Sequence, residues 1–409
     1  MCRPNIVEKY CCTIPPPGAA MTASNFTYIF LGVAAIPFIY YFLALYSSWQ
    51  FFRHAKNSIQ PPGYAPPVSN LKPIRGLDSE AYENFASYCN QDYPDYELLF
   101  GIGDGDEAVL EVIEKLKRDF PHRRIRVVHV SGHTAANDKV VKLARLVSEA
   151  QNEVLVINDS DVRVRPDYLR SVVAPLRDPK IGAVTCLYVS TQEHTFLQKL
   201  QSIGMFCDFY PGIMVAWQLD GVKFAFGQTI VTTRNHLAGF GGYTAIENRP
   251  ADDLLVGRLV AGQGFEVALL PYTVETVADF KSFGEFFFKR LRWMTVMRHM
   301  RPWGHIGLIF TQGLAWSIAA VSVHPSALVA FLYLGGYVCV RAAMTWLIGV
   351  WGLKQAGVWK KMALVPVWDA WALLIWLLSF GRRSIRWRDI DYRIRGGMLV
   401  PVAPPAPQK

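Results

Sequence analysis

Long uncharged runs flank a central region in which short apolar segments alternate with amphipathic ones. The first run, residues 26–49, reads FTYIFLGVAAIPFIYYFLALYSSW. About 20 apolar residues are enough to span a bilayer as a helix. A signal peptide is the alternative, but its apolar part has only about 7–15 residues. We therefore predict a transmembrane helix over 26–49, which follows a leader at 1–25.

The C-terminal third contains a second uncharged region. Residues 302–340 contain no Lys, Arg, Asp or Glu, and His324–Pro325 interrupts the run. A further apolar stretch follows it. The pattern predicts three transmembrane helices within 305–381, located near 305–323, 326–350 and 362–381.

Arg341 and Asp369 fall inside two of these predicted spans. At about 1.5 Å per residue, they lie at similar depths from the cytosolic ends of their helices. We predict that the two side chains pair, because pairing lowers the cost of burying either charge. The alternative is a shorter third span, with Arg341 extending to the membrane surface.

Between residues 50 and 301 the pattern is that of a folded domain. A proline-rich linker at 50–70 precedes a domain at 71–285. The shorter apolar stretch 196–217 is interrupted by charges and predicts core or interfacial structure. Strand patterns alternate with helical ones, at 96–103, 106–120, 125–130, 139–150 and 153–158. This alternation predicts a parallel sheet covered on both faces, with ligands bound beyond the carboxyl ends of the strands.

Composition and charge narrow the class of protein. Of the 409 residues, 51% are hydrophobic and 18% are charged, which excludes a disordered or collagen-like chain. Residues 286–301 carry five basic and no acidic side chains, and residues 382–395 carry a net charge of +4, so these two segments account for the net charge of +9. Both border apolar runs, which argues against a nucleic-acid partner. We predict a basic interfacial helix at 286–301 and a basic tail at 382–409.

The basic residues also predict the orientation of a multi-pass membrane protein. Arg53, His54 and Lys56 follow the first span, so the positive-inside rule puts the central domain in the cytosol. Three further spans would put the tail on the opposite side, yet the arginines after residue 381 favour the cytosol. Either the rule fails there or one segment lies only in the interface. We expect a bacterial inner membrane, or the Golgi in a eukaryote.

Acidic residues follow two of the predicted strands. Asp104 comes after FGIG, and Asp159–Ser160–Asp161 comes after VLVIN. Two carboxylates at one strand end supply the hard oxygen ligands that Mg²⁺ or Mn²⁺ prefers, and such a cation would neutralise a diphosphate. An Asx turn or a helix cap is the alternative for this motif on its own.

Two further motifs carry candidate chemistry. Asp252 and Asp253 precede a helical segment, where they either cap the helix or act as a coupled pair from which one accepts a proton from an attacking hydroxyl. Arg292 and Trp293 belong to the basic segment 286–301. That segment can lie at the membrane surface and also present these two side chains to a diphosphate and an acceptor.

Several segments together resemble the family 21 glycosyltransferases, the ceramide glucosyltransferase family. They are LKPIRGLD, NQDYPDYELLFGIGDGDE, ADD, KRLRW and WRDIDYRIRGG, and the resemblance covers residues 71–397. TCLY, FAFGQTI and VET also resemble bacterial hopanoid-pathway glycosyltransferases. The resemblance implies an α/β GT-A fold, which is a Rossmann-like nucleotide-sugar domain, together with transmembrane α-helices. It also implies a UDP-sugar donor and inversion at the anomeric carbon.

The resemblance implies a role for each candidate site residue. Asp104 would hold the uridine end of the donor, and Lys139 would contact the donor. Asp159 and Asp161 would bind a divalent metal, Mg or Mn, with the diphosphate, and Asp253 would be the base.

The last signature departs from the family pattern. The family has Gln or Arg three residues before its Arg-Trp pair, whereas this chain has Lys289 there. Lysine keeps the charge but lacks the planar fork that binds phosphate through two hydrogen bonds. Arg292 and Trp293 complete the signature.

The implied function is transfer of glucose from UDP-glucose to the primary hydroxyl of ceramide or a similar membrane lipid. One alternative is transfer of N-acetylglucosamine to a hopanoid-type lipid. A non-catalytic membrane scaffold is another, against which the three acidic motifs argue.

Overall fold

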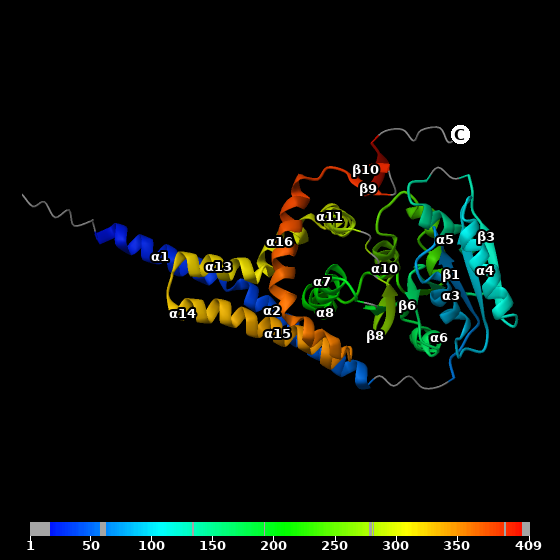
Figure 1. Ribbon diagram of the computed structural model, residues 1–409, viewed down its shortest axis with the longest axis horizontal. Helices are drawn as coiled ribbons and strands as arrows, with labels where there is room; N and C mark the ends of the chain where they lie inside the picture. The colour runs from blue at the N-terminus through cyan, green and yellow to red at the C-terminus, as the bar shows by residue number, and fades with distance from the viewer. Residues whose placement is uncertain are drawn as a thin grey trace, which may run out of the picture.

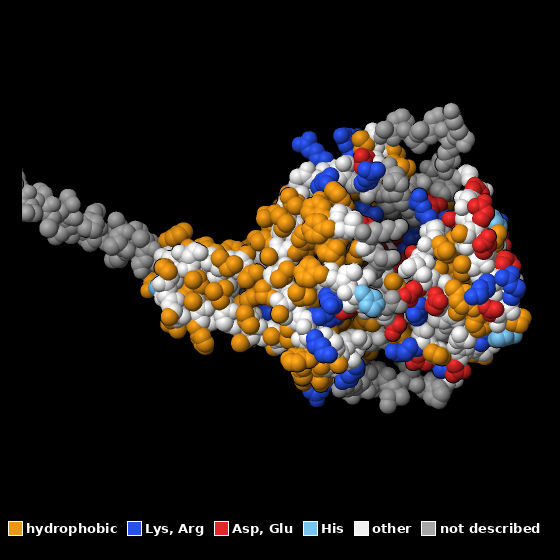
Figure 2. Space-filling view, viewed as in Figure 1, with side chains coloured by type: hydrophobic (Ala, Val, Ile, Leu, Met, Phe, Trp, Pro, Cys, Tyr) orange, Lys and Arg blue, Asp and Glu red, His pale blue; other side chains and the backbone are white. Residues whose placement is uncertain are grey.

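The computed structural model describes residues 17–57, 63–132, 135–191, 193–277, 280, 282–387 and 390–402. Figure 1 shows an α/β domain at one end and long helices that extend away from it at the other. Hydrophobic side chains dominate the surface of these helices, whereas charged side chains gather over the α/β domain (Figure 2).

An eight-stranded sheet forms the centre of the α/β domain, in the order β3-β2-β1-β4-β7-β6-β8-β5. The strands are β1 (Val68–Pro73), β2 (Tyr96–Ile102), β3 (Arg124–His129), β4 (Val154–Ile157), β5 (Val162–Arg163), β6 (Ile181–Thr191), β7 (Ile230–Thr233) and β8 (Glu266–Val277). Strands β3, β2, β1 and β4 are neighbours in the sheet and run parallel to one another. Strand β7 is antiparallel to both β4 and β6. The sheet is therefore mixed, which corrects the prediction of a parallel one.

The reversed strand β7 shapes one edge of the sheet. Its first residue, Ile230, pairs with Ile157, the last residue of β4. The residues before β7 therefore lie beside the residues after β4, at the carboxyl edge of the parallel strands. Apolar periodicity has no direction, so the sequence pattern of this short strand does not reveal the reversal.

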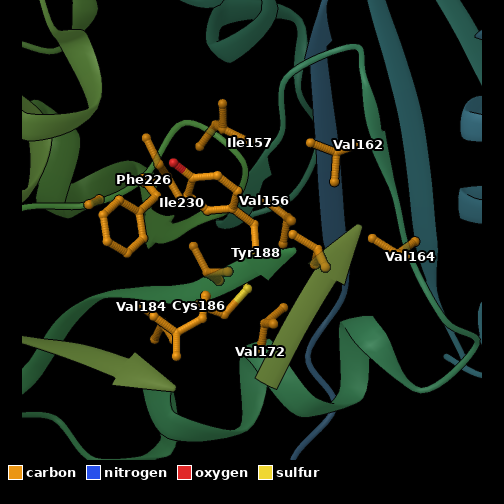
Figure 3. Packing of buried hydrophobic residues seen from close by; sticks show 14 of the residues in the cluster. Val156, Ile157, Val162, Val164, Val172, Val184, Cys186, Tyr188, Phe226 and Ile230 are labelled. Atoms are coloured by element: carbon orange, nitrogen blue, oxygen red, sulfur yellow. The ribbon is translucent and has the colours of Figure 1, made fainter. Parts of the chain in front are cut away.

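Amphipathic helices cover the sheet. Every residue of β1, β2 and β4 is buried, as in strands that are covered on both faces. Val156 of β4, Val184 of β6 and Ile230 of β7 lie within the apolar core (Figure 3). The helices of this domain include α3 (Ala81–Cys89), α4 (Glu107–Asp119), α5 (Asp138–Glu149), α6 (Tyr168–Val173), α9 (Arg234–Ala238) and α10 (Asp252–Gly262). The five predicted strands and helices are confirmed, and so is an α/β fold joined to long apolar helices.

Three helices in the described part of the chain are long and apolar enough to cross a membrane, by length and composition. They are Asn25–His54, Ala327–Gly352 and Ala356–Gly381. The first includes most of α1 (Pro17–Ala34) and of α2 (Ile36–Asn57), the second contains α14 (Ala327–Ala330) and α15 (Gly336–Trp346), and the third contains α16 (Val365–Gly381). The predicted spans at 26–49, 326–350 and 362–381 coincide with these helices.

The remaining predicted span, 305–323, is bent. Its two parts, Pro302–Thr311 and Gly313–Val323, meet at 53°. The hydroxyl of Tyr41 on α2 enters the break, where it donates to the carbonyl of Thr311 at 2.9 Å and accepts from the N–H of Gly313 at 3.0 Å. Backbone groups freed inside a membrane need such partners. The bend thus depends on a side chain from a distant helix. The parts contain α12 (Pro302–Gly307) and α13 (Gly313–Val323).

The predicted pairing of Arg341 with Asp369 is confirmed. Nε of Arg341 donates to Oδ2 of Asp369 at 3.0 Å, and the hydroxyl of Tyr337 donates to the same oxygen at 2.7 Å. Arg341 also donates to the carbonyl of Cys207. The carbonyl belongs to a π-helical turn, η2 (Met205–Phe209), so the ion pair ties α15 and α16 to this turn.

The π-helical turn joins α7 (Phe196–Gly204) to α8 (Tyr210–Asp220). Helix α7 packs on β6 and α16, and α8 packs on α2. The stretch 196–217 therefore lies between the sheet and the apolar helices. This position confirms the prediction of core or interfacial structure.

The C-terminal tail folds as a small antiparallel sheet, β9 (Ile385–Trp387), β10 (Ile390–Arg395) and β11 (Met398–Pro401). Its buried side chains Ile385, Tyr392 and Leu399 pack with Ala136 of the α/β domain and Val296 of α11 (Phe283–Met300). The N–H of Leu399 donates to the carbonyl of Asn248 at 2.8 Å. The tail therefore contacts the α/β domain directly.

Candidate active site

A polar cluster forms where β4 ends and β7 begins. The N–H of Asp159 donates to the carbonyl of Gly227 at 3.0 Å, and Nζ of Lys72 donates to the carbonyl of Asp159 at 3.1 Å. A Cβ at position 227 would lie 2.7 Å from Oδ2 of Asp159 and 3.1 Å from Nζ of Lys139. Glycine therefore leaves room for the carboxylate here, which a Cβ would force to shift.

Lys139 connects two of the acidic motifs that the sequence singled out. Its Nζ lies 2.7 Å from Oδ1 of Asp159 and 3.0 Å from Oδ2 of Asp252. Burial alone would lower the pKa of Lys139. The negative charges of Asp159, Asp252 and Asp253 have the larger effect and hold this pKa well above its usual value. The amide of Asn137 caps the start of α5 by accepting from the N–H of Val140, which fixes the backbone beside Lys139.

Asp253 lies at the start of α10 and faces Gly227. Its Oδ2 accepts from the N–H of Gly227 at 3.1 Å, and its Oδ1 accepts from the N–H of Leu254 at 2.8 Å. The preceding Ala251 has a φ of 56°, a left-handed conformation that is costly for a residue with a Cβ. Burial, and next the charge of Asp252, raise the pKa of Asp253 to about 6. A carboxylate of this pKa is suited to accept a proton.

Asp161 follows Asp159 in the turn before β5. Burial and the charge of Asp159 raise the pKa of Asp161 to about 6, and Lys289 of α11 opposes the rise. A cation beside Asp161 would offset the effect of the neighbouring charge of Asp159. Within the described residues, no group of three or more His, Cys, Asp or Glu side chains could hold a metal ion. Asp159 and Asp161 would supply two carboxylate oxygens to Mg²⁺ or Mn²⁺, with diphosphate oxygens and water completing the coordination, and their role as metal ligands stays a prediction.

Lys72 belongs to this cluster, but sequence reasoning missed it. Burial lowers the pKa of Lys72 to about 7 against the opposing charges of Asp161 and Asp159. Its Nζ lies 3.7 Å from the centre of the Tyr88 ring. A signal was available, since Lys72 belongs to an otherwise uncharged strand, VSNLKP, and a fully buried lysine is rare without a partner.

Asp104 lies on the exposed loop that follows β2. The carboxylate that organises this loop belongs to Asp106, which accepts from the N–H of Gly103 at 2.9 Å and from the N–H of Gly76 at 3.3 Å. The contact of Asp104 with uridine stays a prediction.

Helix α11 forms one wall of a small pocket with a cavity volume of about 30 Å³, lined by Tyr188, Gln201, Met205, Phe209, Phe280, Phe286, Lys289, Arg290 and Trp293. Trp293, a predicted acceptor contact, is 43% exposed. Lys289, where the signature departs from the family, faces both this pocket and the charge of Asp161. Arg292 is not among these described lining residues, and its role stays a prediction. Sequence reasoning gave no role to Arg290, Gln201 or Tyr188, which come together only in the fold.

Known proteins resemble the chain over different lengths. Ceramide glucosyltransferase 3 of Caenorhabditis elegans is 22% identical over 396 residues, which are 91% of this chain and 82% of the relative. A ceramide glucosyltransferase of Komagataella phaffii is 29% identical over 142 residues, 32% of this chain and 28% of that protein. Among solved structures, mannosyltransferase PcManGT from Pyrobaculum calidifontis in complex with GDP-Man and Mn²⁺ is 17% identical, with a TM-score of 0.49 over 82% of this chain and 99% of that one.

A family model matches nearly the whole chain. It is described as glycosyl transferase family 21, and it matches residues 29–400. The match includes the strand-end carboxylates, the Asp252–Asp253 pair, α11 and most of the folded tail. The chain belongs to glycosyl transferase family 21.

Proposed function

We propose that this glycosyltransferase moves glucose from UDP-glucose to the primary hydroxyl of ceramide or a similar membrane lipid, with inversion at the anomeric carbon. The observation that carries the proposal is the cluster of Lys139, Asp159 and Asp253 around Gly227. An aromatic pocket lies next to this cluster, because its Tyr188 contacts Phe226, and its Phe286 stacks on Trp371 of an apolar helix. Similarity to ceramide glucosyltransferases supports a ceramide-type acceptor. A cytosolic catalytic domain on a bacterial inner membrane, or on the Golgi in a eukaryote, is part of the proposal.

In this reaction Asp253 accepts the proton of the acceptor hydroxyl while the hydroxyl oxygen attacks the anomeric carbon and the UDP oxygen departs. The N–H of Gly227, 3.1 Å from Oδ2 of Asp253, fixes the orientation of that carboxylate. The pKa of about 6 keeps Asp253 ionised at neutral pH. Lys139 holds Asp159 in position at 2.7 Å. Asp159 and Asp161 would hold a divalent cation, Mg or Mn, which when bound supplies charge neutralisation for the leaving diphosphate.

Removal of the base tests the proposal. In Asp253→Asn the side chain can still accept a hydrogen bond from Gly227, but it no longer takes up a proton. We expect transfer of radiolabelled glucose from UDP-glucose to ceramide to fall by about 10²–10⁴-fold, the range of general-base catalysis, with UDP binding unchanged. Asp220→Asn, the same change at an exposed carboxylate, is the control. Near-normal turnover of Asp253→Asn would refute the assignment.

Transfer of N-acetylglucosamine to a hopanoid-type lipid is a second candidate. The segment FAFGQTI, which resembles the hopanoid-pathway enzymes, contains the Gly227 that contacts both Asp159 and Asp253. The two functions separate in one assay, in which UDP-glucose and UDP-N-acetylglucosamine are each offered with ceramide and with a hopanoid alcohol. The donor and acceptor pair with the highest kcat/KM decides between them.

A further inference from the structure

Arg290 of α11 is a partly buried cation that lines the aromatic pocket. Its Nε and one terminal nitrogen both donate to Oε1 of Gln201, at 3.0 and 2.7 Å. Its guanidinium carbon lies 4.7 Å from the centre of the Trp368 ring. Within the described residues, no carboxylate oxygen lies within 4.0 Å of its nitrogens. Arg290 is thus held in position without a direct ion pair to any described residue, and the charge of Asp208 only partly opposes the effect of its burial.

The guanidinium of Arg290 has more N–H donors than Gln201 accepts. Arginine carries five N–H donors, and Gln201 accepts from only two of the nitrogens. Removing a charge from water without a partner is costly, and burial lowers the pKa of Arg290. Because Arg290 lines the pocket, a bound molecule with an oxygen acceptor would recover this cost.

The location of the pocket indicates what that molecule is. One side of the pocket carries Lys289, which acts on the active-site carboxylate of Asp161. On the other side, the ring of Phe286 stacks on Trp371 of the apolar helix α16 at 5.5 Å between ring centres. Figure 1 shows α11, α7 and α16 next to one another, and they pack together. Tyr188 of the pocket also contacts Phe226, the neighbour of Gly227, at 5.8 Å between ring centres. The pocket therefore lies between the candidate reacting groups and an apolar helix.

We propose that this pocket holds the polar head of the lipid acceptor, and that Arg290 donates hydrogen bonds to the amide carbonyl next to the acceptor's primary hydroxyl. The inference rests on the proposed function, since it assigns an acceptor to the same site. Arg290 is then a specificity-determining residue, which favours lipids with an amide over plain alcohols. Gln201 and Trp368 position its guanidinium.

The test compares two lipids that differ in the amide. N-hexanoyl sphingosine and hexadecane-1,2-diol both offer a primary hydroxyl, but only the first has a carbonyl beside it. Their affinities are measured for the purified full chain in detergent and for Arg290→Met, Arg290→Lys and Arg301→Met. Arg301 is an exposed arginine that caps the end of the same helix, so its variant is the matched control.

We expect Arg290→Met to weaken binding of N-hexanoyl sphingosine by about 10- to 100-fold, the usual worth of a hydrogen bond from a charged group, and to leave binding of the diol unchanged. Arg290→Lys should fall between these limits, and Arg301→Met should match the parent. Equal affinities of Arg290→Met and the parent for the amide lipid would overturn the inference. So would an equal loss for both lipids, because that result indicates a structural role.

The same preparation separates this inference from the proposed function. If the parent discriminates the two lipids through Arg290 but transfers no glucose to either, the proposed sugar transfer fails and the amide-reading pocket stands. If the parent transfers glucose to ceramide but Arg290→Met binds both lipids normally, the pocket assignment fails and the proposed function stands.

Discussion

Asp253 owes its properties to its immediate neighbours. Asp252 adds a negative charge beside it, Lys139 and Asp159 form the adjoining ion pair, and the N–H groups of Gly227 and Leu254 hold its oxygens. Burial and Asp252 outweigh Lys139, so the pKa of Asp253 rises to about 6. Asp253 thus has a fixed orientation and a pKa that lies only a little below neutral pH.

This pKa predicts the pH dependence of the reaction. The base must be ionised, so kcat/KM should be constant above about pH 7 and should fall about tenfold per pH unit below about pH 6. Asp161 also has a raised pKa of about 6, but a bound cation would keep it ionised. The profile is therefore measured at several concentrations of Mg²⁺ or Mn²⁺. An acidic limb that persists at saturating metal belongs to Asp253, and its absence would contradict the assigned base.

The close contact between Gly227 and Asp159 leads to a second prediction about single residues. In Gly227→Ala the new methyl group would lie 2.7 Å from Oδ2 of Asp159, so the carboxylate must shift and the contact with Lys139 must weaken. We expect kcat/KM for the UDP-sugar to fall by roughly 10-fold or more, consistent with about 1–3 kcal/mol for overpacking. Gly262→Ala is the control, because no atom lies within 4 Å of its Cβ position. Similar kinetics for both variants would disprove the steric argument.

The sequence predicted the residues of the site better than the contacts between them. Asp159, Asp161 and Asp253 stand out because each follows or precedes a recognisable element. Lys72 and Gly227 escaped notice, since their roles come from strand pairing across the sheet rather than from neighbours in sequence. No local pattern states that β7 runs backwards beside β4, although this reversal brings Gly227 to Asp159.

At the scale of elements, the contacts of the π-helical turn η2 link the apolar helices to the pocket. The carbonyl of Cys207 in this turn accepts from Arg341 of α15, and Asp208 accepts from Nε1 of Trp368 on α16 at 3.1 Å. Phe209 of the same turn lines the pocket. π-helical turns of this kind frequently occur at functional sites. The packing of α15 and α16 therefore sets the floor of the pocket.

The ion pair beneath this turn makes a prediction about stability. Asp369→Asn leaves Arg341 buried without a full counter-charge, so the free energy of unfolding in detergent should fall by about 3–5 kcal/mol. The double variant Arg341→Met with Asp369→Leu should be less destabilised, because neither charge remains buried. Thermal unfolding of the purified chain measures both. The control is Asp220→Asn, which removes an exposed ion pair with Lys223 and should leave the melting temperature unchanged. A double variant less stable than Asp369→Asn would contradict this account.

Elements with strong periodicity were predictable within one or two residues, as α4 (Glu107–Asp119) and β2 (Tyr96–Ile102) illustrate. The bend between α12 and α13 was not, because the hydroxyl of Tyr41 on α2 supplies the hydrogen bonds that permit it. The pairing of Arg341 with Asp369 was predictable, because a charge inside an apolar helix is costly unless an opposite charge pairs with it.

At the scale of the whole molecule, the tail returns to the domain from which the apolar helices leave. Its side chains pack on Ala136 and Val296, and Leu399 bonds to Asn248. The sequence indicated that the tail is basic and resembles the family, but not that it folds against the domain. Its docking depends on strand pairing and on side chains far away along the chain, which composition does not reveal.

This contact predicts the result of a labelling experiment. Met398→Cys lies on an exposed strand of the tail and Glu111→Cys on an exposed part of α4. In membrane vesicles of one orientation, a membrane-impermeant maleimide should modify both cysteines or neither, because both belong to one folded unit. The parent chain measures the background from its native cysteines. Labelling of one position alone would show that the tail and the domain lie on opposite sides.

The segment between α11 and β9 starts and ends next to the α/β domain. A segment that leaves one side of a membrane and returns to that side crosses it an even number of times. If the α/β domain lies on one side of a membrane, the three apolar segments in this interval, α12 with α13, α14 with α15, and α16, would not all cross it. The arginines after α16 would then lie on the same side as the domain, which the positive-inside rule requires of a cytosolic domain. Helix α16 packs on α7 and α11 and lies across the direction of α13 and α15 in Figure 1, so it would be the segment that runs along the membrane surface although it is long enough to cross. The acceptor lipid would then meet the enzyme beside a helix that lies in the plane of the membrane.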